Sequence, residues 1–278
     1  MELWFTEEHT KNVRFGVKVD RAIYSAQSEF QRIDIFESPE FGRFLTLDGY
    51  IMLTEKDEFI YHEMLVHVPL CAHGSARRVL VIGGGDGGAV RELMRYPSVE
   101  RVDLVEIDSM VIEAAEKYLP QTASALRDKR VTIHIADGLK FVRQKTDEYD
   151  VILVDSTDPF GPGEGLFTRE FYGNCKRALK ADGILANQHE SPFYAADAPT
   201  NALPPSSRWL AFMRPTSLPT PAVTGSLASP QTGGGRKMQT RLFGKNWGSP
   251  HATTMHSCKE AHLCCHATCA NCSMRDFG

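Results

Sequence analysis

The feature that most constrains the fold is a glycine-rich turn between an apolar strand and a helix. Residues 77–93, RRVLVIGGGDGGAVREL, pass from a run of aliphatic residues through the turn into a helical pattern. The turn matches G-x-G-x-x-G at Gly83, Gly85 and Gly88. Such a turn places backbone N–H groups at a helix start, where a nucleotide-like ligand can bind. A simple tight turn is the less favoured interpretation, because this one joins a strand to a helix.

Strands and helices alternate on both sides of this turn. Asp108 precedes a helical segment and is expected to cap it. The pattern predicts a parallel sheet with helices on both faces and a ligand at the carboxyl ends of the strands. The predicted strands are 77–85, 101–108, 131–138, 149–158 and 183–188, and the predicted helices are 89–96, 109–119 and 168–179.

The first 60 residues have a different pattern. Short β-forming runs predict a small antiparallel β domain, and Asp48-Gly49 is typical of a hairpin turn. Residues 55–70 predict a helix with Phe59, Met64, Leu65 and Val68 on one face. We therefore predict three segments: an N-terminal β domain (1–60), a Rossmann-like catalytic domain (61–198) and an aberrant tail (199–278).

Charge and composition exclude several classes of function. Of the 35 Asp and Glu residues only two lie after residue 198, and the 198 residues before that point are strongly acidic. An acidic body argues against nucleic acid and favours a cationic ligand. There is neither a secretory signal nor a long apolar run, and cysteine is sparse before residue 258. These features predict a cytoplasmic protein without a membrane partner.

Acidic side chains follow the predicted strands at one sheet edge. Asp86 lies inside the glycine turn, where it would repel a pyrophosphate or the carboxylate of S-adenosylmethionine but attract an amine. Glu106 ends the second strand and suits ribose hydroxyls. Asp155 and Asp158 follow the fourth strand, where turn-forming aspartates are the alternative. Because Asp86, Asp155 and Asp158 converge on one edge, we favour a negatively charged amine pocket.

These residues resemble the spermidine synthase (polyamine aminopropyltransferase) family. The resemblance runs from residue 1 to about 198, and its most specific part is DSTDPFGPGEGLF at 155–167. It also includes FQRIDIFES, DEFIYHEMLVHVPL, VLVIGGGDGGAVREL, VEID and ADG. The resemblance implies an N-terminal β domain, a methyltransferase-type Rossmann-like domain and a homodimer or homotetramer. It also implies transfer of an aminopropyl group from decarboxylated S-adenosylmethionine, a co-substrate, to putrescine; no prosthetic group or metal is expected.

The resemblance also assigns roles to particular positions. Asp155 falls on the proton acceptor of the reaction. The positions for the adenosyl co-substrate are Gln31, Glu106, Asp137, Gly138 and Pro162, to which the glycine turn adds Gly83 and Gly85. The positions for the amines are Tyr61, His62, Asp86 and Asp158.

The segment after residue 198 departs from the family. Residues 215–231, PTSLPTPAVTGSLASPQ, have possible codons that give the family-like string HIPTYPSGHWLFGFAS in another frame. We therefore interpret residues 199–278 as a frame-shifted, disordered tail, which leaves the strand at 183–188 with an unpaired edge. His262, Cys265, Cys269 and Cys272 have zinc-ligand spacing, but in a shifted frame this spacing is incidental.

Three functional hypotheses follow. The first is an aminopropyltransferase, and the second is a methyltransferase that uses intact S-adenosylmethionine. Asp86 and the acidic pair Asp155 and Asp158 disfavour the second. The third is an inactive relic, because the frame-shifted tail lacks the tyrosine of the family segment, and the 278-residue chain is therefore expected to be poorly active.

Overall fold

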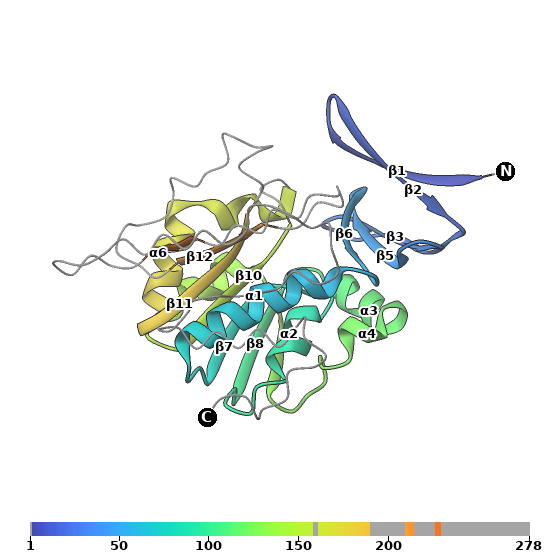
Figure 1. Ribbon diagram of the computed structural model, residues 1–278. Coiled ribbons are helices and arrows are strands. Elements are labelled where there is room, and N and C mark those ends of the chain that lie inside the picture. The colour runs from blue at the N-terminus through green and yellow to red at the C-terminus, as the bar shows by residue number, and fades with distance from the viewer. Residues whose placement is uncertain (1, 158–160, 190–208, 214–225, 229–278) are drawn as a thin grey trace, which may run out of the picture.

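Antiparallel strands precede the strand–helix alternation in the computed structural model (Figure 1), which describes residues 2–157, 161–189, 209–213 and 226–228. The N-terminal strands are β1 (Leu3–Thr10), β2 (Val13–Val19), β3 (Arg21–Gln27), β4 (Arg32–Ser38), β5 (Gly42–Leu47) and β6 (Tyr50–Thr54). The later strands are β7 (Arg78–Gly83), β8 (Arg101–Glu106), β9 (Val131–Ile135), β10 (Tyr149–Asp155), β11 (Leu179–His189), β12 (Trp209–Met213) and β13 (Ser226–Ala228). The helices are α1 (Glu58–His73), α2 (Gly88–Leu93), α3 (Ser109–Tyr118), α4 (Pro120–Ala123), α5 (Gly138–Arg143), the 3-10 helix η1 (Gly161–Phe167) and α6 (Arg169–Ala178).

The central sheet has the strand order β13-β12-β11-β10-β7-β8-β9. All neighbouring strands are parallel except β12 and β13, which are antiparallel. The chain runs from β7 outward to β9 and then returns to the other side of β7 with β10. This reversal creates a switch point between the carboxyl ends of β7 and β10, where Gly83 and Asp155 are register partners. Ligands in open α/β sheets bind at such a point.

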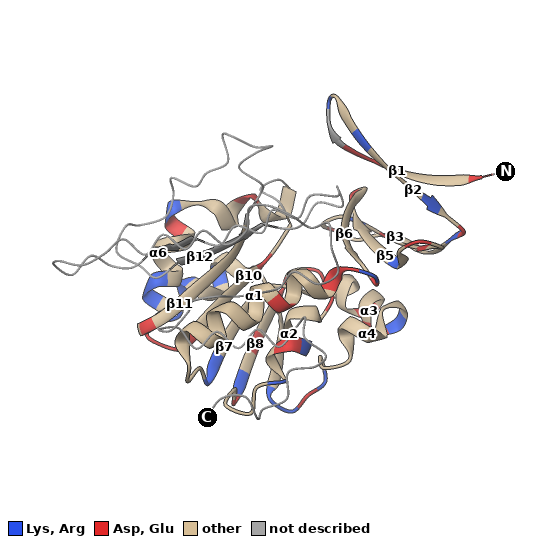
Figure 2. Ribbon diagram, in the orientation of Figure 1, with Lys and Arg blue, Asp and Glu red and all other residues tan. Residues whose placement is uncertain are grey.

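Apolar residues alternate between the two faces of this sheet. On β7, Val79 and Val81 face a core shared with α1, α2 and α3, while Leu80 and Ile82 face a core shared with α5, η1 and α6. Buried strands of a parallel sheet are apolar on both faces for this reason. The amino ends of β7 and β8 are arginines, Arg78 and Arg101. At the opposite, carboxyl ends lie two acids, Asp86 in the glycine turn after β7 and Glu106 at the end of β8, so the two ends of these strands differ in charge (Figure 2).

The N-terminal part forms a four-stranded sheet, β3-β4-β5-β6, and a separate β1–β2 hairpin. The predicted Asp48-Gly49 turn joins β5 to β6, and both residues have positive φ, 50° and 84°. Two consecutive residues with positive φ are typical of the type I′ turn, which suits a two-residue hairpin loop. The small sheet packs Ile33, Ile35 and Leu45 onto α3, so apolar contacts connect it to the helices that cover the central sheet.

The structure corrects two of the sequence predictions. The predicted apolar face of 55–70 is wrong at Phe59, which is 42% exposed, although Met64, Leu65 and Val68 pack in the core as predicted. The buried residues of α1 also include Glu58, Tyr61 and His62. The polar residues are buried because this part of α1 borders the pocket described below. The predicted unpaired edge at 183–188 is also wrong, because β12 pairs in parallel with β11. The sequence patterns did not indicate α4, α5, η1, β12 or β13.

The predicted Asp108 cap is confirmed, since its Oδ1 accepts from Met110 N at 3.0 Å. The rest of the predicted tail, including His262 and the cysteines around it, lies outside the described residues. The frame-shift interpretation therefore stays a prediction.

We expect the contact between the small sheet and α3 to contribute strongly to stability. Ile35 is fully buried in this contact, and Ile35→Ala should lower the free energy of unfolding by about 2–5 kcal/mol. The matched control is Ile135→Ala at the end of β9, where the side chain is 54% exposed and the loss should stay within about 0.5 kcal/mol. Urea denaturation of both variants measures this, and equal losses would contradict the packing described.

Candidate functional site

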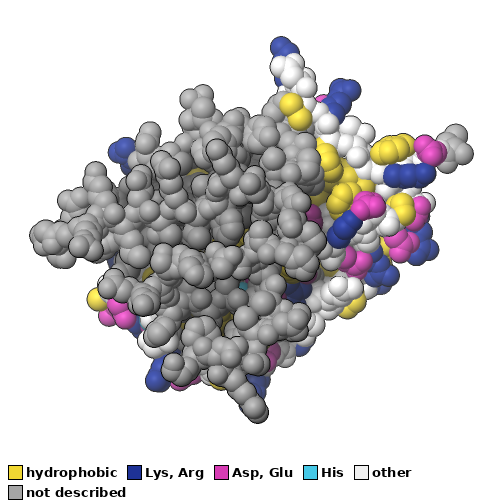
Figure 3. Space-filling model, in the orientation of Figure 1, with side chains coloured by type: hydrophobic (Ala, Val, Ile, Leu, Met, Phe, Trp, Pro, Cys, Tyr) yellow, Lys and Arg dark blue, Asp and Glu magenta, His cyan; other side chains and the backbone are white. Residues whose placement is uncertain are grey.

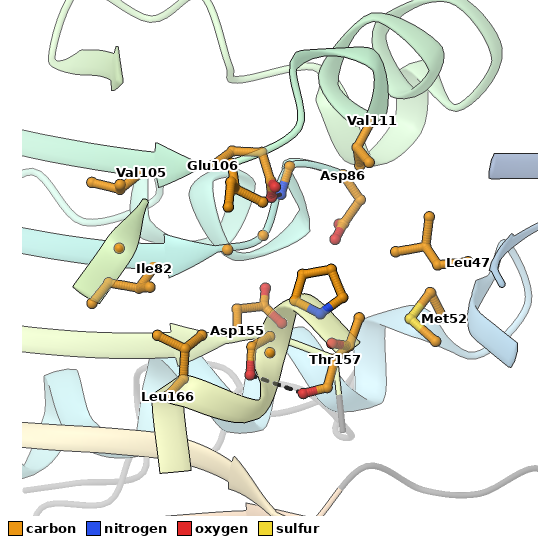
Figure 4. A pocket seen from close by; sticks show the side chains of 18 of the residues that line it. Leu47, Met52, Ile82, Asp86, Val105, Glu106, Val111, Asp155, Thr157 and Leu166 are labelled. Atoms are coloured by element: carbon orange, nitrogen blue, oxygen red, sulfur yellow. Dashed lines mark hydrogen bonds between the residues drawn. The ribbon is translucent and has the colours of Figure 1, made fainter. Parts of the chain in front are cut away.

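One pocket lies at the switch point, between the central sheet and the N-terminal sheet. It collects eleven of the twelve residues that the sequence analysis proposed for the site, namely Gln31, Tyr61, His62, Gly83, Gly85, Asp86, Glu106, Asp137, Gly138, Asp155 and Pro162. The twelfth, Asp158, lies outside the described residues. Figure 4 shows Asp86, Glu106 and Asp155 around the same space, although they come from different loops and strand ends.

Glu106, at the end of β8, is held by the backbone. Its Oε2 accepts from Gly85 N at 3.1 Å and its Oε1 accepts from Asp108 N at 3.0 Å. Burial raises the pKa of the Glu106 carboxyl to about 7, against the lowering effect of these two N–H groups. A Cβ on Gly85 would lie 2.9 Å from Glu106 Oε2, so the second glycine of the motif leaves room for this carboxylate.

Asp108 connects Glu106 to the N-terminal sheet. Its Oδ2 accepts from Ser28 Oγ at 2.6 Å and from Gln31 Nε2 at 3.2 Å, while its Oδ1 caps α3. Gln31 precedes β4 and reaches the pocket only because the small sheet packs on α3. The sequence analysis identified Asp108 as a helix cap and missed its contacts with Ser28 and Gln31.

The opposite wall of this part of the pocket is built from α5 and η1. Asp137 caps α5, with Oδ1 accepting from Leu139 N at 2.9 Å. Gly138 follows it, and a Cβ there would lie 2.5 Å from Ile82 Cγ2. Pro162 lies in η1, which borders the same space.

Asp155, at the end of β10, is buried and oriented by a tyrosine. Tyr61 Oη donates to Asp155 Oδ1 over 2.7 Å, so the phenol from α1 fixes the direction of the carboxylate. Gly83 makes this close approach possible: its φ is +79°, and a Cβ would lie 2.1 Å from the Asp155 carbonyl oxygen. The first glycine of the motif is therefore required by the neighbouring strand.

His62 and Asp86 lie next to Asp155. Asp86 Oδ1 accepts from Gly88 N at 2.8 Å and lies 3.3 Å from His62 Nε2. Burial acts to lower the pKa of His62, but the carboxylates of Asp86, Glu58 and Asp155 outweigh it and raise that pKa to about 10. His62 is therefore an imidazolium at neutral pH in this arrangement.

The pocket also has an apolar wall that the sequence analysis missed. Leu45, Leu47, Met52 and Leu53 come from β5 and β6, and Val111 comes from α3. In Figure 4, Leu47 and Met52 lie on the side of the pocket opposite Ile82 and Leu166. Nothing in the local pattern of the β5–β6 hairpin distinguished these leucines from ordinary core residues.

Two groups of three potential metal ligands occur among the described residues. One is His62, Asp86 and Asp155, which would need a neutral imidazole to coordinate an ion. The other is Glu63, His67 and Glu92, in which Glu92 already bonds to the guanidinium groups of two arginines. The sequence prediction that the site holds no metal stays a prediction.

The fold and pocket define a Rossmann-like α/β protein with a carboxylate-lined ligand site. Residues 58–230 match the family described as "Spermine/spermidine synthase domain", and residues 3–55 match the "Spermidine synthase tetramerisation domain". The chain therefore belongs to the spermidine synthase family, whose members are transferases.

Two similar curated proteins share one name. A polyamine aminopropyltransferase of Alkaliphilus oremlandii is 66% identical over 198 residues, which cover 71% of this chain and 70% of that protein. A polyamine aminopropyltransferase of Clostridium botulinum is 65% identical over 194 residues, which cover 70% of this chain and 68% of that protein. The aligned lengths of 198 and 194 residues are close to the predicted extent of the resemblance, whereas the family match continues to residue 230.

Solved structures show the same fold. A spermidine synthase in complex with the transition-state analogue AdoDATO has a TM-score of 0.70 and 51% identity, covering 72% of this chain and 69% of that one. A spermidine synthase of Thermotoga maritima has a TM-score of 0.67 and 52% identity, covering 70% of this chain and 66% of that one.

Within the described residues, no helix has the length and hydropathy needed to span a bilayer.

Asp108 should matter as a helix cap and as a link between the domains. Asp108→Ala removes the cap and both side-chain bonds, and it should lower the free energy of unfolding by about 1–3 kcal/mol. Asp108→Asn should lose less, because Asn caps helices as well as Asp does. Chemical denaturation tests this order, and equal losses would show that capping is unimportant here.

Proposed function

We propose that the chain is an aminopropyltransferase that moves the aminopropyl group of decarboxylated S-adenosylmethionine to putrescine. The products would be spermidine and methylthioadenosine. The observation that carries this proposal is that two carboxylates line the same pocket: Asp155, which Tyr61 orients, and Asp86 of the glycine turn. The names of the relatives, polyamine aminopropyltransferases, support the same reaction.

The adenosyl group would bind between the glycine turn and the N-terminal sheet. Glu106 would accept hydrogen bonds from the ribose hydroxyls, next to Gln31. Asp137, Gly138 and Pro162 would border the adenine. The apolar side chains of Leu47 and Met52 suit a thioether product better than a charged one.

The amine side would be recognised by charge. Asp86 would bind the ammonium of the aminopropyl group, and the same carboxylate would repel the additional carboxylate of intact S-adenosylmethionine. Asp158, His62 and Tyr61 would help to hold the amines. A methyltransferase that uses the intact co-substrate is the less favoured function for this reason.

Asp155 would be the proton acceptor. An alkylammonium has a pKa of about 10, so the attacking amine of putrescine must first lose a proton. Asp155 would accept it, and the amine would attack the methylene carbon next to the sulfonium. The new C–N bond forms as the C–S bond breaks, and the sulfur leaves as a neutral thioether. Alignment of the two substrates would supply much of the rate.

We also propose that the chain forms a homo-oligomer through its N-terminal strands. Residues 3–55 match a tetramerisation domain. Leu3 and Trp4 on β1 are 51% and 56% exposed, and Figure 3 shows hydrophobic side chains on the described surface of this region. Exposed apolar side chains grouped on one element suit an interface.

Product analysis tests the proposed function. The chain is incubated with decarboxylated S-adenosylmethionine and putrescine, and spermidine and methylthioadenosine are measured by mass spectrometry in equal amounts. A second chain, in which the residues after 198 follow the alternative frame, should turn over faster. S-adenosylhomocysteine formed from the intact co-substrate, or no transfer by either chain, would contradict the proposal.

Asp155→Asn should keep the fold and the binding of methylthioadenosine but reduce turnover by about 100-fold or more. The change preserves shape and removes the proton acceptor. The measurement is kcat at neutral pH in the more active of the two chains, with calorimetric binding of methylthioadenosine as the control. Turnover close to that of the unaltered chain would refute the role of Asp155.

Asp86→Asn should raise the dissociation constant of decarboxylated S-adenosylmethionine by at least about tenfold. The dissociation constant of methylthioadenosine should rise much less, because only the former ligand carries an ammonium. Calorimetric titration of the two ligands gives the ratio directly. Equal losses would instead assign Asp86 a structural part in the turn, where it accepts from Gly88 N.

A further inference from the structure

His62 lies between two carboxylates. Its Nδ1 is 2.5 Å from Glu58 Oε2, one turn earlier on α1, and its Nε2 is 3.3 Å from Asp86 Oδ1. The ring is only 2% exposed. A neutral imidazole has a single N–H, so one of its nitrogens would turn a lone pair toward a carboxylate. Only the doubly protonated ring donates to both.

Glu58 is itself held from behind by Arg91 of α2. Arg91 Nη1 donates to Glu58 Oε1 at 2.7 Å, and Nη2 donates to Oε2 at 3.0 Å. A two-point contact of this kind fixes a carboxylate in position. Burial acts to raise the pKa of Glu58, but His62 and Arg91 outweigh it, so that pKa is lowered. Glu58 thus stays charged behind the ring.

The ring has little room to move. A Cβ on Gly88 would lie 2.2 Å from His62 Cε1 and 2.4 Å from Nδ1, so only a glycine at this third position of the motif leaves room for the ring. The Tyr61 ring lies on another side, with its centroid 5.2 Å from that of His62. The charged groups around the ring are Glu58 on α1, Asp86 in the glycine turn and Asp155 at the end of β10.

We propose that Glu58, clamped by Arg91, is a positioning residue that keeps His62 doubly protonated, so that a fixed positive charge holds Asp86 in place and sets the charge of the amine pocket. The part that concerns the ligand rests on the proposed function. The charge state of His62 does not.

The expected pH dependence follows from the same contacts. The folded-state pKa of His62 is about 10, above its ordinary value of 6.5, so the imidazolium contributes stability below pH 6.5 and this is lost as pH rises through about 10. Glu58→Gln removes one of the carboxylates that hold the proton. The pKa of His62 should then fall, and the pocket should become more negative within the range of pH 6 to 9.

The first experiment observes His62 directly in the unaltered protein. Long-range proton–nitrogen NMR correlations distinguish a doubly protonated ring from either neutral tautomer, and His62→Gln assigns the signal. At pH 8 we expect both ring nitrogens to be protonated. A neutral His62 at pH 8 would overturn the inference, and this test does not require a variant of Glu58 to fold.

The second experiment compares Glu58→Gln with Glu63→Gln, a change on the same helix outside the contact with His62. We expect Glu58→Gln to lose the second ring proton between pH 6 and 9, and Glu63→Gln to keep it. An unchanged His62 titration in Glu58→Gln would overturn the role of Glu58.

Ligand binding then tests the consequence for the pocket. From pH 6 to 9 the ratio of the dissociation constants of methylthioadenosine and decarboxylated S-adenosylmethionine should change in the unaltered chain only as far as Glu106, whose pKa is about 7, ionises. In Glu58→Gln the ratio should change at least about fivefold more, in favour of the cationic ligand, as His62 also loses its proton. A change in the variant no larger than in the unaltered chain would overturn the link to the pocket. If neither ligand binds the unaltered chain, the proposed function and that link both fail, while NMR still decides the role of Glu58.

Discussion

The site depends on the electrostatics of three carboxylates that come from separate elements and meet in one buried space. Asp86 follows β7, and Glu106 and Asp155 are the last residues of β8 and β10; the carboxyl ends of these strands lie together near the switch point of the sheet. Burying an ionised carboxyl is costly unless fixed partners compensate for lost water. Tyr61 supplies that compensation for Asp155, and Gly88 N with His62 supplies it for Asp86. Backbone N–H groups supply only part of it for Glu106, whose pKa burial still raises to about 7.

The same requirement explains the glycine turn. Gly83, Gly85 and Gly88 are each closely approached by a group of the site: the Asp155 backbone, the Glu106 carboxylate and the His62 ring. In a dinucleotide-binding turn the glycines make room for a pyrophosphate. In this chain they make room for groups of the protein itself: a neighbouring strand, the Glu106 carboxylate and the His62 ring.

Much of this arrangement could be predicted from sequence. The alternation of strands and helices placed Asp86, Glu106 and Asp155 at one edge, because parallel strands end on the same side. Gln31 could be assigned only by resemblance, since its approach depends on how the small sheet packs on α3. The charge of His62 could not be predicted from the sequence, because it depends on contacts of Glu58 and Asp86 with the two nitrogens of the ring. The pairing of β12 with β11 was not expected, because the composition after residue 198 shows no strand period.

The central claim is that this pocket recognises an ammonium where related folds accept a carboxylate-bearing co-substrate. The most direct test is calorimetric binding of decarboxylated and intact S-adenosylmethionine to the unaltered chain at neutral pH and equal ionic strength. The decarboxylated form should bind at least about 100-fold more tightly, because the two ligands differ only in a carboxylate that would lie near Asp86 and Asp155. Equal affinities, or tighter binding of the intact form, would contradict this claim.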